Sequence, residues 1–378
     1  MADRTRDRTS SPDSDGTGEA GVRHSVTRRR PLLKQLATGI VAGTSLLAGC
    51  ETETPQPTPT PTERKGGSED SDAPGVGVYL GDESALETWE QWFGRTVDYY
   101  SFNVPTTGWE KYRVDNMPFE RSIEDIAADR QIAVTAKLFP PDATTMGAVA
   151  NGDHTEKHRQ FAASLVAHGM GDATIRLGHE LNGRWSPDTA VGRPELFAEA
   201  WRQVRSAMDE AEGASFSYMW APHVGRVHMD PERAYPGDDW VDIVGLTLYD
   251  KSDRYFPDEC GADCVRERRR ENWDRLVNME FGLDHWAEFT RTRGKTLVFP
   301  EYGVVDREWN SAGGGDNPLF FDWFAEWVGQ NSDVVGWHNV WNFVAGPHYV
   351  GPPSLHVSEQ WSPHTDASQA FRRNFSGG

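Results

Sequence analysis

Short apolar runs alternate with longer amphipathic stretches from residue 75 to the C-terminus. Apolar runs of this length, bounded by turn-forming residues, predict buried strands. We expect eight strands, at residues 75–80, 96–104, 131–139, 173–180, 215–222, 241–249, 296–303 and 334–341. The amphipathic stretches predict helices near 84–93, 120–128, 153–169, 193–211, 272–292, 317–330 and 364–373.

The helical pattern is clear in residues 193–211. Phe197, Trp201, Val204 and Met208 recur at the spacing that places them on one helix face, and a proline stands in the first turn. The segment after the fifth strand is the weakest unit, because it leaves little room for a full helix.

Eight strands that alternate with helices over residues 75–378 predict a (β/α)₈ TIM barrel. An open, doubly wound sheet is the alternative. Its dinucleotide-binding version has no support, since no glycine-rich phosphate fingerprint follows the first strand. In a barrel the reactive groups lie at the C-terminal ends of the strands.

The first 49 residues have the order of an export signal. Arg29 and Arg30 in "TRRRPLLK" resemble a twin-arginine motif. The apolar stretch 36–48 that follows is too short to span a bilayer but fits the apolar region of a signal peptide. It closes with "LLAGC", which resembles a lipobox, so we expect a twin-arginine lipoprotein signal at 1–49 and lipidation of Cys50.

Residues 50–74 are rich in threonine and proline and contain no apolar core. Such a segment favours an extended, semi-rigid spacer. We therefore expect an exported protein at the cell surface, anchored by a lipid at Cys50 to the outer face of the cytoplasmic membrane.

The chain is strongly acidic and poor in lysine. It has 38 basic and 58 acidic residues, a formal net charge of −20, and only 7 of the basic residues are lysine. Nucleic acid binding needs a basic patch, so this balance argues against it. Excess negative charge keeps a protein soluble in concentrated salt, which favours a halophilic source.

The three cysteines are Cys50, Cys260 and Cys264. Outside the cell, a local disulfide between Cys260 and Cys264 is the favoured interpretation, and a pair of free thiols is the alternative. Two thiolates alone make a poor zinc site, because structural zinc takes four ligands.

Two glutamates stand at the ends of separate predicted strands. In "IRLGHELNGRW", residues 175–185, Gly178 lets the chain leave the strand so that His179 and Glu180 can address one cleft. Glu301 ends the seventh strand and Tyr249 the sixth, where its hydroxyl could orient Glu301. Carboxyl groups about 5 Å apart cleave glycosidic bonds with retention.

Each of these residues has a structural alternative. A single glutamate at a strand end is more often a solvated loop carboxylate, and a lone histidine is more often a structural residue. The joint placement of Glu180, Tyr249, Glu301 and Trp337 on four strands favours a site instead.

The segment "IRLGHELNGRW" resembles the acid/base segment of glycoside hydrolase family 26, whose members are retaining (β/α)₈ glycosidases. That family has histidine before the acid/base glutamate and tryptophan five residues after it, positions held here by His179, Glu180 and Trp185. "FPEYG" is similar to the strand that carries the nucleophile, here Glu301. The resemblance implies that His179 and Trp185 bind substrate.

Other segments extend the resemblance over roughly residues 75–375. "PGDDWVDIVGLTLYD" resembles the strand whose tyrosine, here Tyr249, touches the nucleophile. "GWHNVWNFVAGPHYVGPP" resembles the last strand and its loop, which implies that Trp337 is a sugar platform. "YMWAPH" is similar to the family's fifth strand.

Three departures concern contacts with the sugar. "SPDTAVG" follows Trp185 where the family often has aromatic residues, Lys137 lies near the position of a histidine on the third strand, and His338 stands where arginine is common. They affect the substrate assignment more than the chemistry.

The resemblance implies a β-glycanase that needs no metal and no cofactor. β-1,4-Mannan is the substrate that it favours. β-1,3-Xylan and β-glucan are alternative substrates within the family. Two alternatives are not enzymes. One is a surface carbohydrate-binding protein that has lost turnover, and the other is the solute receptor of an uptake system. The receptor would have two lobes and a hinge instead of a barrel.

Overall fold

The computed structural model describes residues 73–377, apart from 118, 120–121 and 253–259. The chain divides into two units, Met1–Thr60 and Pro61–Gly378, and every described residue belongs to the second. The predicted export signal and nearly all of the stalk lie outside the described residues.

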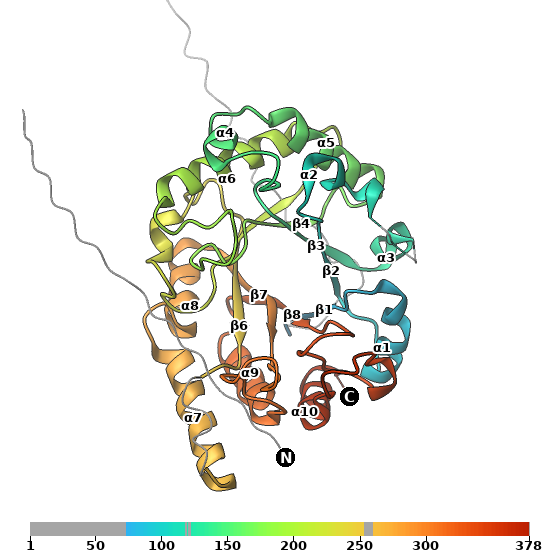
Figure 1. The fold of residues 1–378 in the computed structure, drawn as a ribbon, viewed down its shortest axis with the longest axis vertical. Helices are drawn as coiled ribbons and strands as arrows, with labels where there is room; N and C mark the ends of the chain where they lie inside the picture. The colour runs from blue at the N-terminus through green and yellow to red at the C-terminus, as the bar shows by residue number, and fades with distance from the viewer. Residues whose placement is uncertain (1–72, 118, 120–121, 253–259, 378) are drawn as a thin grey trace, which may run out of the picture. The chain divides into compact units, whose positions relative to one another are not determined.

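Eight parallel strands close into one barrel in the order of the sequence (Figure 1). The strands are β1 (Gly75–Tyr79), β2 (Tyr99–Asn103), β3 (Gln131–Ala136), β4 (Thr174–Leu177), β5 (Ser217–Trp220), β6 (Ile243–Tyr249), β7 (Thr296–Gly303) and β8 (Val335–Trp341). The ring closes where β1 pairs with β8. The predicted (β/α)₈ barrel is confirmed, and a two-lobed receptor does not fit it.

Helices follow the strands and surround the barrel (Figure 1). They are α1 (Leu86–Phe93), α2 (Gly108–Lys111), α3 (Ile123–Asp129), α4 (Met146–Ala150), α5 (Thr155–Ala167), α6 (Pro194–Asp209), α7 (Ala262–Asn278), α8 (Leu283–Arg293), α9 (Pro318–Gln330) and α10 (Thr365–Phe375). Only a short 3₁₀ turn, Pro231–Ala234, follows β5, as the weak pattern there predicts.

One predicted helix is wrong. Residues 272–292 do not form a single helix, because α7 ends at Asn278 and α8 begins at Leu283. Phe281 adopts a left-handed backbone with φ 57° between them. Gly282 follows it so closely against the end of α7 that an added Cβ would lie 2.7 Å from three carbonyl oxygens.

The inward and outward faces of the strands carry different side chains. Leu297, Phe299 and Tyr302 on β7 are buried, and Phe299 and Tyr302 pack their rings against Phe324 of α9. Inward positions hold Met219 and Val298 in a separate small cluster. Alternation along each strand therefore gives the outer face to the helix layer and the inner face to the barrel interior.

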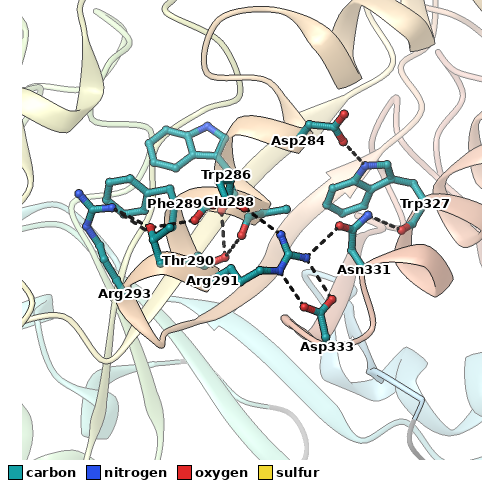
Figure 2. A network of polar contacts seen from close by, with 12 residues as sticks. Asp284, Trp286, Glu288, Phe289, Thr290, Arg291, Arg293, Trp327, Asn331 and Asp333 are labelled. Carbon is teal, nitrogen blue, oxygen red and sulfur yellow. Dashed lines mark hydrogen bonds and ion pairs between the residues drawn. The ribbon is translucent and has the colours of Figure 1, made fainter.

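Polar contacts hold α8 against the end of α9 and the segment just before β8. Figure 2 shows this network: the Trp327 indole N–H donates to Asp284 at 2.9 Å, and Asn331 donates to the Trp327 carbonyl at 3.0 Å. Arg291 donates to both carboxylate oxygens of Asp333 at 2.8 and 3.1 Å. The network fixes two neighbouring helices of the outer ring.

No helix in the described part of the chain combines the length and the apolar content needed to cross a membrane.

The Asp284→Ala variant should lower the free energy of unfolding by about 1–2 kcal/mol, because the indole N–H of buried Trp327 loses its acceptor. Chemical denaturation measures the loss. Glu288→Ala is the control, since Glu288 is exposed and contacts only the surface residue Arg291, and it should change stability by less than about 0.5 kcal/mol. Equal losses in the two variants would contradict this assignment.

Candidate active site

Glu180 lies just past the end of β4, where the backbone leaves the strand. Gly178 has φ 59° and Glu180 has φ 54°, both in the left-handed region. The Glu180 N–H donates to the Ala221 carbonyl at 2.8 Å, which ties this turn to the neighbouring strand end. A non-glycine residue in this region costs about 1–3 kcal/mol, and such residues cluster at active sites.

Glu301 lies inside the barrel on β7, where two donors hold it. The Arg176 guanidinium on β4 donates to Oε2 at 2.6 Å, and the Tyr249 hydroxyl at the end of β6 donates to Oε1 at 2.8 Å. Arg176 also donates to Thr247 Oγ1 at 2.5 Å. Each carboxylate oxygen of Glu301 therefore has a fixed donor from a different strand.

The environments of the two glutamates push their pKa values apart. Burial, and then the negative charge of Glu301, raise the pKa of Glu180 above its ordinary value. Burial also disfavours the charged form of Glu301, but the Arg176 charge and the hydrogen bonds from Arg176 and Tyr249 outweigh it and lower the pKa of Glu301. Glu180 is thus the group that keeps a proton, and Glu301 is the group that stays ionised.

His179 is neutral beside this pair. Burial, then the charges of Arg176 and Lys137, lower the pKa of His179 to about 3. The negative charge of Glu301 acts in the opposite direction on the same imidazole. Its Nδ1 atom is buried and has no hydrogen-bond partner among the described residues.

Trp185 is in direct contact with Glu180. Its indole N–H donates to Glu180 Oε2 at 2.5 Å, while 55% of the residue remains exposed. The rings of His223 and His228 flank it at 6.0 and 6.1 Å. An exposed indole in hydrogen-bond contact with the acid suits a wall of a sugar-binding cleft.

Lys137, at the end of β3, fixes the loop that carries Trp185. Its ammonium donates to Ser186 Oγ at 2.6 Å and lies 3.6 Å from the carboxylate of Asp188. Asp188 is 1% exposed and also accepts from the Leu138 N–H at 3.0 Å. The departure seen in the sequence at this position is therefore an anchor for the loop after β4.

The structure places Trp337 near the N-terminal end of the barrel, away from the C-terminal strand ends, which corrects its predicted role as a sugar platform. Trp337 pairs with Gly75, the first residue of β1, and is 3% exposed. It stacks on Tyr99 with ring centroids 4.4 Å apart inside the barrel. His338 points outward, where it accepts from or donates to the Tyr302 hydroxyl at 2.8 Å and packs against Phe375 of α10.

Trp341 takes the position at the mouth that was expected for Trp337. It pairs with Tyr79, the last residue of β1, and stacks on its ring at 3.9 Å with planes 12° apart. Burial and then the Glu301 charge raise the pKa of Tyr79 to about 12, so this aromatic pair lies beside the nucleophile position.

Sequence reasoning missed the roles of Arg176 and Trp341. The sequence held a sign of each role. Arg176 is the one charged residue in the apolar strand β4. Trp341 lies four residues beyond Trp337, so it shares a face of β8 with Trp337 but is nearer the mouth.

Cys260 and Cys264 are joined by a disulfide bond next to the start of α7. Cys50 lies outside the described residues. Within the part of the chain that the structure describes, no group of three or more histidine, cysteine, aspartate or glutamate residues is arranged to hold a metal ion.

Glycoside hydrolases of the barrel type use two carboxyl groups of opposite pKa shift at the barrel mouth, and this site has that arrangement. Residues 172–262 match the sequence profile of Glycosyl hydrolase family 26. This stretch includes Arg176, His179, Glu180 and Tyr249. The family match and the fold both agree with the resemblance to glycoside hydrolase family 26 that the sequence carries.

Known proteins of this kind act on more than one glycan. A β-1,3-xylanase of Alcaligenes sp. is 23% identical over 70% of this chain and 60% of its own length. A mannan endo-1,4-β-mannosidase of Bifidobacterium adolescentis is 25% identical over 57% of this chain and 21% of its own. The chain therefore spans less than two-thirds of either relative.

Solved structures agree in fold. A Cellulomonas fimi endo-β-1,4-mannanase double mutant superposes with a TM-score of 0.55 at 18% identity, over 80% of this chain and 74% of that one.

Glu180→Gln should stabilise the protein increasingly as the pH rises from 4 to 7. The folded protein holds the Glu180 proton more tightly than the unfolded chain, so ionisation above the ordinary carboxyl pKa favours unfolding. Calorimetry should show a melting temperature a few degrees above wild type at pH 7 and a smaller difference at pH 4. Exposed Glu212→Gln is the matched control. A difference that shrinks with rising pH would contradict a raised pKa.

Proposed function

We propose that the chain is a retaining β-glycan hydrolase in which Glu301 is the nucleophile and Glu180 the general acid and base. The observation that carries the proposal is the opposite direction of the two pKa shifts at one barrel mouth. A nucleophile has to be ionised while the acid is still protonated, and this pairing of environments supplies both states at the same pH.

In the first step, a Glu301 oxygen forms a bond to the anomeric carbon while the bond to the glycosidic oxygen breaks. Glu180 gives its proton to that oxygen, so the leaving sugar departs as an alcohol. In the second step, Glu180 as a carboxylate takes a proton from water. The resulting hydroxyl oxygen bonds to the anomeric carbon and releases Glu301, and the configuration is retained.

The neighbours of Glu301 have defined tasks in these steps. Arg176 and Tyr249 hold the carboxylate in one orientation with both oxygens hydrogen-bonded. As negative charge leaves Glu301 during attack, Glu180 is losing its proton, so the charge of the pair stays constant. Trp185 donates to Glu180 and fixes the orientation of the acid. Neutral His179 adds a hydrogen-bonding group for sugar hydroxyls.

β-1,4-Mannan is the substrate that we propose first, with internal cleavage of the chain. The mannosidase of B. adolescentis and the mannanase fold of C. fimi favour mannan. The Alcaligenes β-1,3-xylanase aligns with more of this chain, which makes β-1,3-xylan the second candidate.

Purified protein should release reducing sugar from one glycan of a panel of mannan, β-1,3-xylan and mixed-linkage β-glucan, assayed at high salt. Glu301→Ala should reduce kcat by about 10⁴-fold or more, and Glu180→Ala by about 10²- to 10⁴-fold. Glycan binding without product release would support a binding protein instead. Full activity of Glu301→Ala would contradict the mechanism.

We further propose that the protein is exported and held at the outer face of the cytoplasmic membrane by a lipid on Cys50. The support is the order of the twin-arginine motif, the apolar stretch and "LLAGC". In a host that carries out twin-arginine export and lipidation, the full chain should be found in the membrane fraction and the Cys50→Ser variant should not. Equal partitioning of both would contradict lipid anchoring, whereas the hydrolase test above is unaffected by it.

A further inference from the structure

Lysine is scarce in this chain, yet it occurs at the barrel mouth. Only 7 of the 38 basic residues are lysine, and both Lys137 and Lys251 follow strand ends at the site. The ammonium of Lys137 is engaged by Ser186 and Asp188. Lys251 has no part in the reaction described above, and its position needs a separate explanation.

The backbone around Lys251 is fixed by the loop after β7. Lys251 forms an antiparallel bridge with Gly313, and the Ser252 N–H donates to the Ala312 carbonyl at 2.7 Å. The preceding residue, Asp250, is 2% exposed and accepts from Asn317 at 2.7 Å. The backbone of Lys251 is therefore held against the loop after β7.

The ammonium of Lys251 faces the catalytic pair. It lies 5.0 Å from the centre of the Tyr249 ring, and it interacts electrostatically with both Glu180 and Glu301. The residue is half-buried, and burial lowers the pKa of Lys251. Among the residues that the structure describes, no hydrogen bond or ion pair is formed by this ammonium.

The buried His348 ring contacts both Tyr249 and an exposed indole, Trp309. The ring of His348 lies 4.9 Å from Tyr249 and 5.1 Å from Trp309, which stands on the loop after β7. Burial lowers the pKa of His348 to about 4, so the imidazole is neutral, and its Nδ1 contacts the Val304 carbonyl at 2.9 Å. Trp309 remains 48% exposed.

We propose that Lys251 and Trp309 form a sugar-binding subsite that borders Glu301, in which the ammonium donates hydrogen bonds to sugar oxygens and the indole covers the apolar face of the ring. This inference rests on the proposed function and deepens it. A half-buried ammonium has lost part of its hydration, and oxygen atoms of a bound sugar replace it. The exposed Trp309 indole, which reaches Tyr249 through the His348 ring, gains from burial under a sugar.

The charge of Lys251 also has a consequence for pH dependence. Among the described residues, the groups that face it are Tyr249 on β6, Glu180 after β4, Glu301 on β7 and neutral His348 after β8. A positive charge favours the ionised form of a carboxyl, so its removal raises the pKa of both glutamates. Both limbs of the pH–activity profile should therefore move to higher pH when Lys251 is replaced by a neutral residue.

Three variants test the subsite: Lys251→Met removes the charge, Lys251→Arg keeps it, and Trp309→Ala removes the ring. Lys157→Met, on the exposed face of α5, is the matched control. Calorimetry measures binding of mannohexaose and of β-1,3-linked xylohexaose in the Glu301→Gln background, so that turnover does not interfere. Kinetics and pH profiles use the enzyme with Glu301 intact.

Lys251→Met should weaken binding of the preferred hexasaccharide about 10-fold or more, raise KM more than it lowers kcat, and shift the pH profile upward. Lys251→Arg should retain the wild-type pH profile, and Trp309→Ala should weaken binding without moving it. A Lys251→Met variant that matches Lys157→Met in binding and pH profile overturns the proposal. If Lys251→Met binds the hexasaccharides normally, the proposed subsite is wrong but the proposed hydrolase function stands. If the protein with Lys251 and Trp309 intact binds no glycan, the proposed function is wrong as well.

Discussion

The buried ion pair between Arg176 and Glu301 is the interaction on which the site depends. Arg176 is 1% exposed and Glu301 9%, so each would be strongly destabilised without the other. The pair joins β4 to β7 across the inside of the barrel, and Thr247 on β6 takes a further donor of the guanidinium. A closed ring of strands is what brings these three positions together from segments far apart in the sequence.

The same pair sets the chemistry of the neighbouring glutamate. Because Arg176 holds Glu301 ionised, a negative charge is always present near Glu180 and helps to keep Glu180 protonated. The left-handed backbone at Glu180 places its side chain beside that charge instead of along the strand. Burial and the Glu301 charge thus raise the pKa of Glu180, whereas the charge and hydrogen bond of Arg176 lower the pKa of Glu301, and the two values are separated.

Much of this arrangement could be predicted from the sequence. The eight apolar runs defined the barrel because strands buried on both faces have few polar positions, and strand ends in a barrel meet at one mouth. Glu180, Glu301 and Tyr249 could be selected for that reason, and the structure brings them together.

The errors have physical causes. Alternation along β8 shows that Trp337 and Trp341 share a face, but the level at which each lies depends on the stagger of all eight strands. The break between α7 and α8 depends on packing of Gly282 against backbone, which periodicity does not report. The anchoring role of Lys137 required knowledge of Asp188, whose loop has no regular pattern.

The central claim is that one mouth holds one ionised and one protonated glutamate at the same pH. Carbon-13 NMR titration of the glutamate side-chain carboxyls, assigned with Glu180→Gln and Glu301→Gln, measures both pKa values directly. The account predicts a value for Glu301 below that of an exposed glutamate and a value for Glu180 above it. Two carboxyls that titrate together at the ordinary value, or in the reverse order, would contradict it.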